Sequence, residues 1–254
     1  MQTSWFIRRQ PRPAVGKRLL CFPYAGAGAS VFRDWDGAVP ADVEVLAVQL
    51  PGRETRLRER PVDDVAEVVA HLVRDIEPYL DCPVVFFGHS MGGLVAFELA
   101  RALIRAGLPA PAGLIVSARR APRLPHVDAP LHSLDDTSFV AEIQRRYGGI
   151  PEAVLEHRDL LELLLPALRA DIHALETWQY TPATPLDCPI LALGGAEDRR
   201  VTAADLDAWA AETRGAFSRH VVPGGHFFLQ SARPQVLSLV ASVLSPLRPL
   251  AAAS

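Results

Sequence analysis

The stretch VVFFGHSMGGLVAFELA, residues 84–100, decides how this sequence is interpreted. Its first residues are apolar, β-branched or aromatic, as in a buried strand, and the residues after Gly92 follow a helical pattern. The turn between them is so tight that it forces its central residue, Ser90, into strained backbone angles. Because side chains at Gly88 and Gly92 would collide with the strand and the helix, glycine is needed at both positions. The stretch therefore predicts a serine hydroxyl held out at the carboxyl end of a sheet.

The rest of the chain alternates between short apolar runs and longer helical patterns. Most of these runs are apolar along their whole length, which is typical of parallel strands covered on both faces. The sequence predicts strands over 18–24, 43–50, 83–89, 112–118, 189–195 and 218–224. It predicts helices over 62–80, 92–107, 203–213 and 234–247. This alternation indicates an α/β fold, with a mostly parallel sheet and helices on both of its faces.

One long segment interrupts the alternation. Residues 120–182 contain no strand pattern, and a proline-rich connector in this segment is followed by helical pieces. A helical insertion of this size in an α/β sheet usually forms a lid over a site, although it could also be a decoration that only packs on the sheet. We therefore expect a core formed by residues 1–119 and 183–254, with residues 120–182 as a helical lid insertion.

Composition narrows the class of protein. With 254 residues and 49% hydrophobic content, the chain can bury a large core. Its 26 basic and 29 acidic residues leave a net charge of −3, which argues against a nucleic-acid partner. The 3 cysteines have no zinc-site spacing and favour reduced thiols. Because the sequence shows neither a signal peptide nor an apolar run of roughly 20 residues, we expect a cytoplasmic monomer with no membrane contact.

The turn around Ser90 has the pattern G-x-S-x-G, the nucleophile elbow of α/β hydrolases. A serine hydroxyl is a poor nucleophile at neutral pH, so it needs a base, and the base needs an orienting acid. His226 follows the last predicted strand on a loop with paired glycines, which can bring its imidazole to the serine. The strand after the nucleophile ends without a carboxylate, whereas the next one ends in a turn containing Glu197 and Asp198. We predict Asp198 as the acid, with Glu197 as the alternative.

Attack on an acyl carbon creates an oxyanion, which needs hydrogen-bond donors. The backbone N–H of Met91, at the start of the helix behind the serine, is one predicted donor. The other is expected in the loop after the first predicted strand, where small residues let the backbone approach a substrate, and Ala25 is the candidate. His89 precedes the serine, so we expect its side chain to point away from the reaction and to pack in the core. The sequence shows no cluster of metal-ligand residues, and we expect no metal or cofactor.

Several motifs, taken in order and spacing, resemble those of the type II thioesterases of polyketide and nonribosomal peptide synthesis, which are discrete editing enzymes. The motifs are CFPYAGAGAS (21–30), LPGRETRLRE (50–59), FFGHSMGGLVAFELAR (86–101), GGAEDRRV (194–201) and PGGHFFL (223–229). The resemblance covers nearly the whole chain, including the lid position, and implies the same triad and oxyanion donors. One departure is Tyr24, where the family commonly has histidine.

This resemblance implies a function and a partner. The reaction would be hydrolysis of acyl thioesters held on the phosphopantetheine arm of acyl or peptidyl carrier proteins, which clears stalled or aberrant acyl groups from a synthase. Carrier domains are typically acidic, so arginines near the serine could form a docking surface, although exposed arginines can also be only a solvated face. The candidates are Arg53, Arg56, Arg58, Arg60, Arg119, Arg120 and Arg123.

Other functions stay open at this point. A general carboxylesterase, or an acyl-CoA thioesterase acting on free small substrates, would use the same triad, but the sequence has no HGGG-type oxyanion motif. A chain-terminating, cyclising thioesterase is disfavoured because no carboxylate follows the strand at 112–118. A non-catalytic α/β-hydrolase fold serving as a binding module usually lacks a triad member, and here all members are present.

Overall fold

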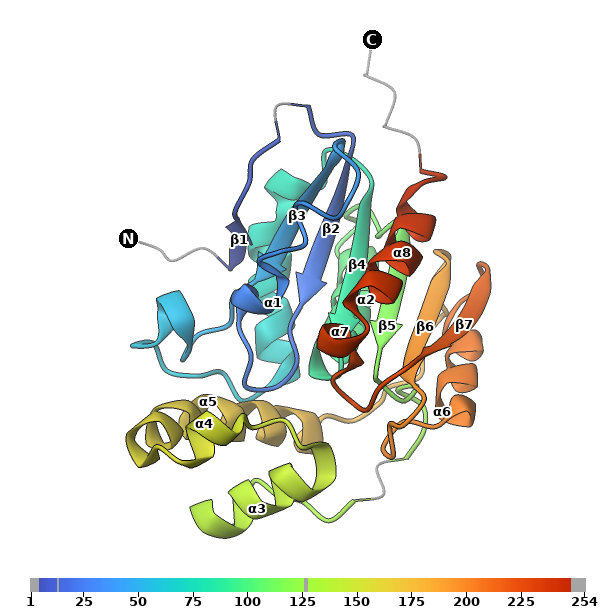
Figure 1. The fold of residues 1–254 in the computed structure, drawn as a ribbon. Coiled ribbons are helices and arrows are strands. Elements are labelled where there is room, and N and C mark those ends of the chain that lie inside the picture. The colour runs from blue at the N-terminus through green and yellow to red at the C-terminus, as the bar shows by residue number, and fades with distance from the viewer. Residues whose placement is uncertain (1–4, 13, 126–127, 248–254) are drawn as a thin grey trace.

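The computed structural model describes residues 5–12, 14–125 and 128–247, so the two ends of the predicted core and a short part of the predicted lid lie outside it. In this part of the chain the strands form a 7-stranded sheet in the order β1-β3-β2-β4-β5-β6-β7 (Figure 1). The strands are β1 (Phe6–Arg8), β2 (Lys17–Phe22), β3 (Val43–Val48), β4 (Val84–His89), β5 (Gly113–Ser117), β6 (Ile190–Gly195) and β7 (Phe217–Val222). Neighbouring strands are parallel except for the antiparallel pair of β1 and β3.

Helices cover both faces of this sheet because successive strand side chains point to opposite sides. Phe86 of β4 packs on one face, in a core shared with α1 (Val65–Ile76) and α2 (Met91–Arg105). The next residue, Phe87, packs on the other face, in a core shared with α8 (Arg233–Leu244). Burial on both faces explains why the strands are apolar along their whole length. The predicted mostly parallel α/β-hydrolase fold is confirmed.

The predicted helices form with shifted ends: α2 and α8 begin one residue earlier than predicted, and α1, α2 and α8 end earlier. The pattern at 203–213 divides into α6 (Ala203–Asp207) and the 3-10 helix η4 (Ala208–Glu212). The remaining short helices outside the lid segment are η1 (Ala29–Phe32), η2 (Glu54–Arg56), η3 (Glu77–Tyr79) and α7 (Phe228–Ser231). Among the described residues, no helix combines the length and the apolar character needed to cross a bilayer.

Strand β1 was not predicted. It has 3 residues and pairs with the outer edge of β3, with Phe6 opposite Val48. Because alternation over so few residues carries almost no signal, the pairing is decided by tertiary structure and not by a local pattern.

The segment between β5 and β6 contains helices and, in its described part, no strand. The helices are α3 (Asp136–Tyr147), α4 (Glu152–Leu155) and α5 (Arg158–Thr177). Figure 1 shows them together beyond the carboxyl ends of the central strands. They share a small apolar core of their own, formed by Leu131, Phe139, Ile143, Ile150, Leu165 and Ile172. This placement is the one expected of a lid, while the division of the chain at residues 120 and 182 stays a prediction.

The turn between β4 and α2 has the predicted strain. Ser90 has φ 53° and ψ −113°, a left-handed conformation that is rare for residues other than glycine. A Cβ atom on Gly88 would overlap the backbone of Gly92, and one on Gly92 would overlap the carbonyl oxygens of Phe22 and Pro23. The two glycines therefore allow α2 to approach both β4 and β2 closely, and this approach fixes the position of Ser90.

Gly92→Ala is expected to lower the free energy of unfolding by about 1–3 kcal/mol, because the added methyl group overpacks the contact between α2 and β2. Gly37→Ala is the matched control, since a Cβ there meets nothing within 4 Å, and we expect a change within about 0.5 kcal/mol. Urea unfolding of both variants measures the difference. Equal midpoints would show that the fold does not need this close approach.

Candidate active site

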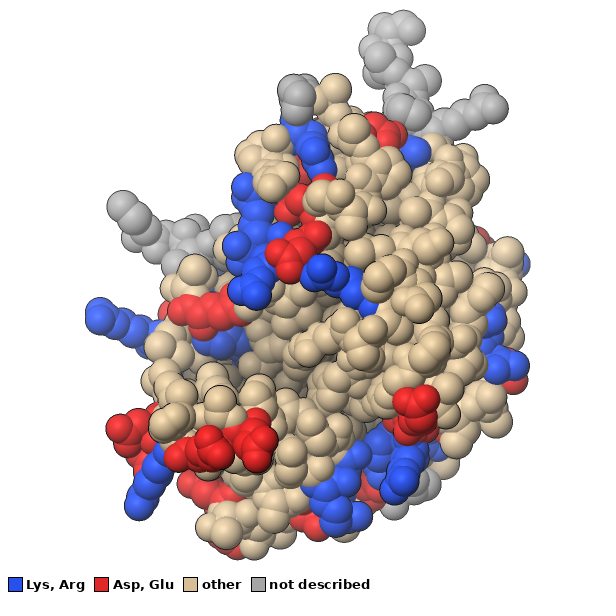
Figure 2. Space-filling view, viewed as in Figure 1, with Lys and Arg blue, Asp and Glu red and all other residues tan. Residues whose placement is uncertain are grey.

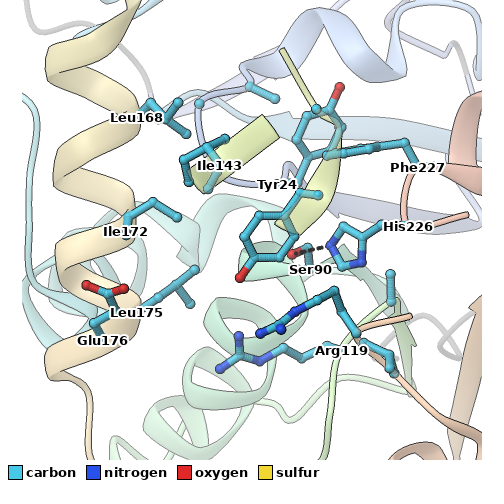
Figure 3. A pocket seen from close by; sticks show the side chains of 18 of the residues that line it. Tyr24, Ser90, Arg119, Ile143, Leu168, Ile172, Leu175, Glu176, His226 and Phe227 are labelled. Carbon is cyan, nitrogen blue, oxygen red and sulfur yellow. Dashed lines mark hydrogen bonds between the residues drawn. The ribbon is translucent and has the colours of Figure 1, made fainter. Parts of the chain in front are cut away.

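Three side chains from distant parts of the sequence meet at the carboxyl edge of the sheet. The Oγ atom of Ser90 lies 3.1 Å from Nε2 of His226 (Figure 3). Nδ1 of His226 lies 2.8 Å from Oδ2 of Asp198. Ser90 follows β4, Asp198 follows β6, and His226 lies between β7 and α7. Glu197, the alternative acid, is exposed, and its side chain makes no hydrogen bond with a described residue. The structure thus joins the three predicted side chains in one hydrogen-bonded chain.

The surroundings of Asp198 determine which atoms of Asp198 and His226 carry protons. Its side chain is fully buried, which raises the pKa of the carboxyl group, but hydrogen bonds from His226 and from the N–H groups of Arg200 and Val201 outweigh burial. The net pKa lies below the ordinary value, so Asp198 is an anion at neutral pH. An ionised carboxylate can only accept hydrogen bonds, so His226 carries its proton on Nδ1. Its Nε2 atom is then free to accept the proton of Ser90.

His89 packs in the core as predicted, and it also holds the backbone of His226, which the sequence analysis missed. Its Nε2 atom lies 2.9 Å from the carbonyl oxygen of His226, and its Nδ1 atom lies 2.9 Å from Oγ of Ser117. Because a carbonyl only accepts, Nε2–H donates to it, and Nδ1 accepts from the Ser117 hydroxyl. Burial, with a smaller contribution from nearby His226, lowers the pKa of His89 to about 3. His89 is therefore a neutral support for the loop that carries His226.

The predicted oxyanion donors are both close to the serine in the fold. Met91 is the first residue of α2, where a backbone N–H has no acceptor within the helix and the helix dipole favours negative charge. Ala25 follows β2 and lines the same cavity as Ser90. The N–H of Ala25 makes no hydrogen bond with a described residue. Both N–H groups can thus receive a developing negative charge, and their role as donors stays a prediction.

A cavity of about 950 Å³ lies between the core and the lid helices, with Ser90 and His226 in its lining (Figure 3). Apolar side chains of α5 form one wall; they recur every three or four residues and so share one face of the helix. These side chains are Leu161, Leu165, Leu168, Ile172 and Leu175. Within the described ranges, no group of three or more His, Cys, Asp or Glu side chains is arranged to hold a metal ion.

Tyr24, the departure from the family pattern, lies in the lining of this cavity. Its hydroxyl accepts a hydrogen bond from Nε2 of Gln230 at 3.1 Å, and its ring packs edge-to-face against Phe227. Burial raises the pKa of the phenol, more than the Gln230 contact lowers it, so Tyr24 is neutral.

The prediction of Arg53 and Arg56 as docking cations was wrong. They are only 2% and 6% exposed. Arg53 makes a buried ion pair with Asp171, and Arg56 pairs with Glu59, whose side chain is partly exposed. The local sequence is rich in arginine, but it does not show that the loop after β3 turns these two side chains inward. Arg58 and Arg60 in the same segment are exposed.

The arginines after β5 differ among themselves. Arg120 pairs with Asp205 and Arg123 pairs with Glu212, each at 2.8 Å. Arg119 makes no ion pair with a described residue, and its Nε atom is buried without a hydrogen-bond partner. Arg119 lines the same cavity as Ser90 (Figure 3). Burial lowers the pKa of Arg119 to about 10, so it is still a cation at neutral pH.

Charged side chains of both signs alternate on the face seen in Figure 2. Acidic side chains gather over the lid helices, and basic ones lie beside them. This face therefore presents no continuous basic surface, and the three arginines after β5 do not act as one exposed cluster, because two of them are paired.

The fold and the buried chain of serine, histidine and aspartate define a serine hydrolase of the α/β-hydrolase type. The family model described as "Thioesterase domain" matches residues 17–244, and the chain therefore belongs to the thioesterase family. The resemblance inferred from the motifs is confirmed, and the chain is a thioester hydrolase rather than a non-catalytic binding module.

Similar proteins come from biosynthetic pathways. The gramicidin S biosynthesis protein GrsT of Aneurinibacillus migulanus is 39% identical over 241 residues, which cover 95% of this chain and 94% of GrsT. The type II thioesterase BorB from the borrelidin biosynthetic cluster is 36% identical, with a TM-score of 0.85 over 96% of this chain and 98% of BorB. The RedJ thioesterase from the prodiginine pathway of Streptomyces coelicolor is 39% identical, with a TM-score of 0.86 over 93% and 94% of the two chains.

Neutral, buried His89 makes the fold sensitive to acid. The unfolded chain takes up a proton at this residue below its ordinary pKa of 6.5, whereas the folded chain does not until about pH 3. The free energy of unfolding should therefore fall as the pH drops through this window, with a contribution of about 1.4 kcal/mol per pH unit. In His89→Gln this contribution is absent, so the slope between about pH 6 and 4.5 should be shallower by about one proton.

Urea unfolding at several pH values measures these slopes. His220→Gln, at an exposed position on β7, is the control and should keep the wild-type slope. If His89→Gln also keeps it, His89 is not held neutral in the folded chain.

Proposed function

We propose that this thioesterase hydrolyses acyl thioesters carried on the phosphopantetheine arm of acyl or peptidyl carrier proteins, and so removes aberrant or stalled acyl groups from a polyketide or nonribosomal peptide synthase. The observation that carries the proposal is the hydrogen-bonded chain of Ser90, His226 and Asp198 at a cavity under the lid helices, one wall of which is apolar. Such a cavity suits an acyl chain, and a flexible arm can deliver a thioester to a serine inside it. GrsT and BorB, named for gramicidin S and borrelidin biosynthesis, support this kind of synthase as the partner.

In the first half of the reaction, Oγ of Ser90 attacks the carbonyl carbon of the thioester while Nε2 of His226 takes its proton. The negative charge on the carbonyl oxygen is stabilised by the N–H groups of Ala25 and Met91. The tetrahedral intermediate collapses, the C–S bond breaks, and the thiol leaves with the proton from His226. Asp198 stabilises the imidazolium that exists between these steps. The product is an acyl ester of Ser90 and a free pantetheine thiol.

In the second half, His226 takes a proton from water, whose oxygen attacks the acyl ester. The ester bond to Oγ breaks, the proton returns to Ser90, and a carboxylic acid leaves. A simple thiol has a pKa of roughly 8.5, so it departs easily and needs little acid assistance. A base, an orienting acid and oxyanion donors are therefore sufficient, and the proposed reaction uses no metal or cofactor of the enzyme.

Hydrolysis of a panel of acyl-carrier proteins tests this function. We expect higher kcat/KM for carrier-bound acyl thioesters than for matched oxygen esters or acyl-CoA, and loss of about 1,000-fold or more in Ser90→Ala. A preference for free esters or for acyl-CoA would instead indicate a general esterase or a thioesterase for free small substrates. Full activity of Ser90→Ala would exclude the proposed mechanism.

Arg119 is the member of the predicted docking set that best fits this function. Arg119 is half-buried, its Nε atom has no hydrogen-bond partner, and it makes no ion pair with a described residue, so an anion that pairs with it gains binding energy. The phosphopantetheine arm carries a phosphate, and we include in the proposal that Arg119 binds it. Arg120 and Arg123 are less suited because Asp205 and Glu212 already neutralise them.

Arg119→Gln should raise KM roughly tenfold for an acyl-phosphopantetheine substrate and leave KM for the matching acyl-pantetheine unchanged, because only the first carries the phosphate. Steady-state kinetics with both substrates measure this difference. Arg120→Gln is the control and should change neither KM. Equal effects of Arg119→Gln on both substrates would refute phosphate binding.

A further inference from the structure

The loop that carries Ala25 is held by side chains from outside the loop. The N–H of Gly26 donates to Oδ2 of Asp171 at 2.7 Å, and the carbonyl of Ala27 accepts from Nη1 of Arg53 at 3.3 Å. Asp171 lies on α5 of the lid, and Arg53 lies in the loop after β3. The two residues after Ala25, Gly26 and Ala27, are thus held by hydrogen bonds to side chains from two other segments.

Arg53 and Asp171 also form an ion pair with each other. Nη1 and Nη2 of Arg53 lie 2.5 Å and 2.9 Å from the two carboxylate oxygens of Asp171, a two-pronged ion pair. Each residue is only 2% exposed. Removing two charges from water costs free energy that their attraction barely offsets, so a buried ion pair contributes little to stability by itself. The pair instead fixes the relative position of the two side chains, because both hydrogen bonds form in only one arrangement.

More contacts fix the same loop from the segment around Arg53. The side-chain oxygen of Gln49 accepts from the N–H of Ala29 at 3.0 Å, and the carboxylate of Glu54 accepts from the N–H and the hydroxyl of Ser30. These contacts hold the far end of the loop to the core. Among the hydrogen bonds of the described residues, the one from Gly26 to Asp171 ties the near end of the loop to the lid, and Ala25 also packs against the apolar core of the lid.

The position of α5 therefore affects the direction of the Ala25 N–H. If α5 moved away, Arg53 would lose its carboxylate in a buried site, and the Gly26 N–H would lose its acceptor. Gly26 has φ +78°, a conformation that glycine leaves easily once it is no longer held. The peptide that joins Ala25 to Gly26 could then rotate and displace Ala25, whose own N–H belongs to the preceding peptide, between Tyr24 and Ala25.

We propose that Arg53 and Asp171 are positioning residues that set the oxyanion hole, so that the hole is complete only while α5 is seated on the core. The same helix forms a wall of the acyl cavity, so closure over a substrate and completion of the hole occur together. This inference rests on the proposed function in one respect, the assignment of the Ala25 N–H as an oxyanion donor.

The test compares Asp171→Asn and Arg53→Lys with the wild-type chain, using a small acyl-pantetheine thioester. Both changes keep the size of the side chain nearly constant but remove the two-pronged pair. We expect kcat per active site to fall roughly 10- to 100-fold, because misplacing one donor costs about that much, while KM changes less than about threefold. Titration of reactive Ser90 with a fluorophosphonate counts the folded, active molecules, so a loss of folded protein is not mistaken for a loss of rate.

A boronic acid that forms a tetrahedral adduct with Ser90 gives the second readout. Its affinity should fall by the same factor as kcat/KM, which a merely structural role would not require. His173→Leu is the matched control: Nδ1 of His173 ties α5 to the backbone oxygen of Asp63 at 3.0 Å but does not touch the loop. We expect its kcat to stay within about threefold of the wild-type value.

Unchanged kcat per titrated site in both variants would overturn the proposal, as would an equal loss in His173→Leu. The assay uses a small thioester and does not depend on a carrier protein. An enzyme that ignores carrier-bound thioesters would therefore contradict the proposed function and leave this comparison intact.

Discussion

The close approach of α2 to strands β2 and β4 is the constraint on which the rest of the site depends. It is allowed by Gly88 and Gly92, whose missing side chains leave room for backbone against backbone, and it holds Ser90 at φ 53°. The same contact places the N-terminus of α2, with the N–H of Met91, directly behind the serine. Because parallel strands end at one edge of the sheet, the turns after β6 and β7 deliver Asp198 and His226 to the same place.

The buried polar side chains that support Ser90 and His226 are satisfied by one another. His89 joins the hydroxyl of Ser117 to the backbone of His226, and Asp198 accepts from His226 and from backbone N–H groups of its own turn. A buried polar group without a partner is costly, so each of these networks favours a single arrangement. The apolar core on the two faces of the sheet supplies the driving force for folding, and the polar networks decide where the reacting atoms lie.

The lid takes part in the site in two ways. Its helix α5 forms an apolar wall of the cavity, and one residue on it, Asp171, holds the loop of Ala25 through Gly26 and Arg53. The motif LPGRE, which the sequence analysis used only as a family signal and as a source of docking cations, thus has a structural role. Its arginine and glutamate both hold the loop after β2.

The sequence by itself determined the alternation of strands and helices, the strained turn at Ser90, and the choice of His226 and Asp198, because apolar periodicity and glycine spacing are local signals. Only the tertiary structure decided that β1 pairs with β3, that Arg53 turns inward, that Asp171 meets it, and that His89 holds the base. Each of these outcomes depends on which residues far apart in the chain come to share a buried volume. A local pattern does not show which distant residue a buried polar group will contact. In the folded chain, the cost of burying an unpaired polar group selects that contact.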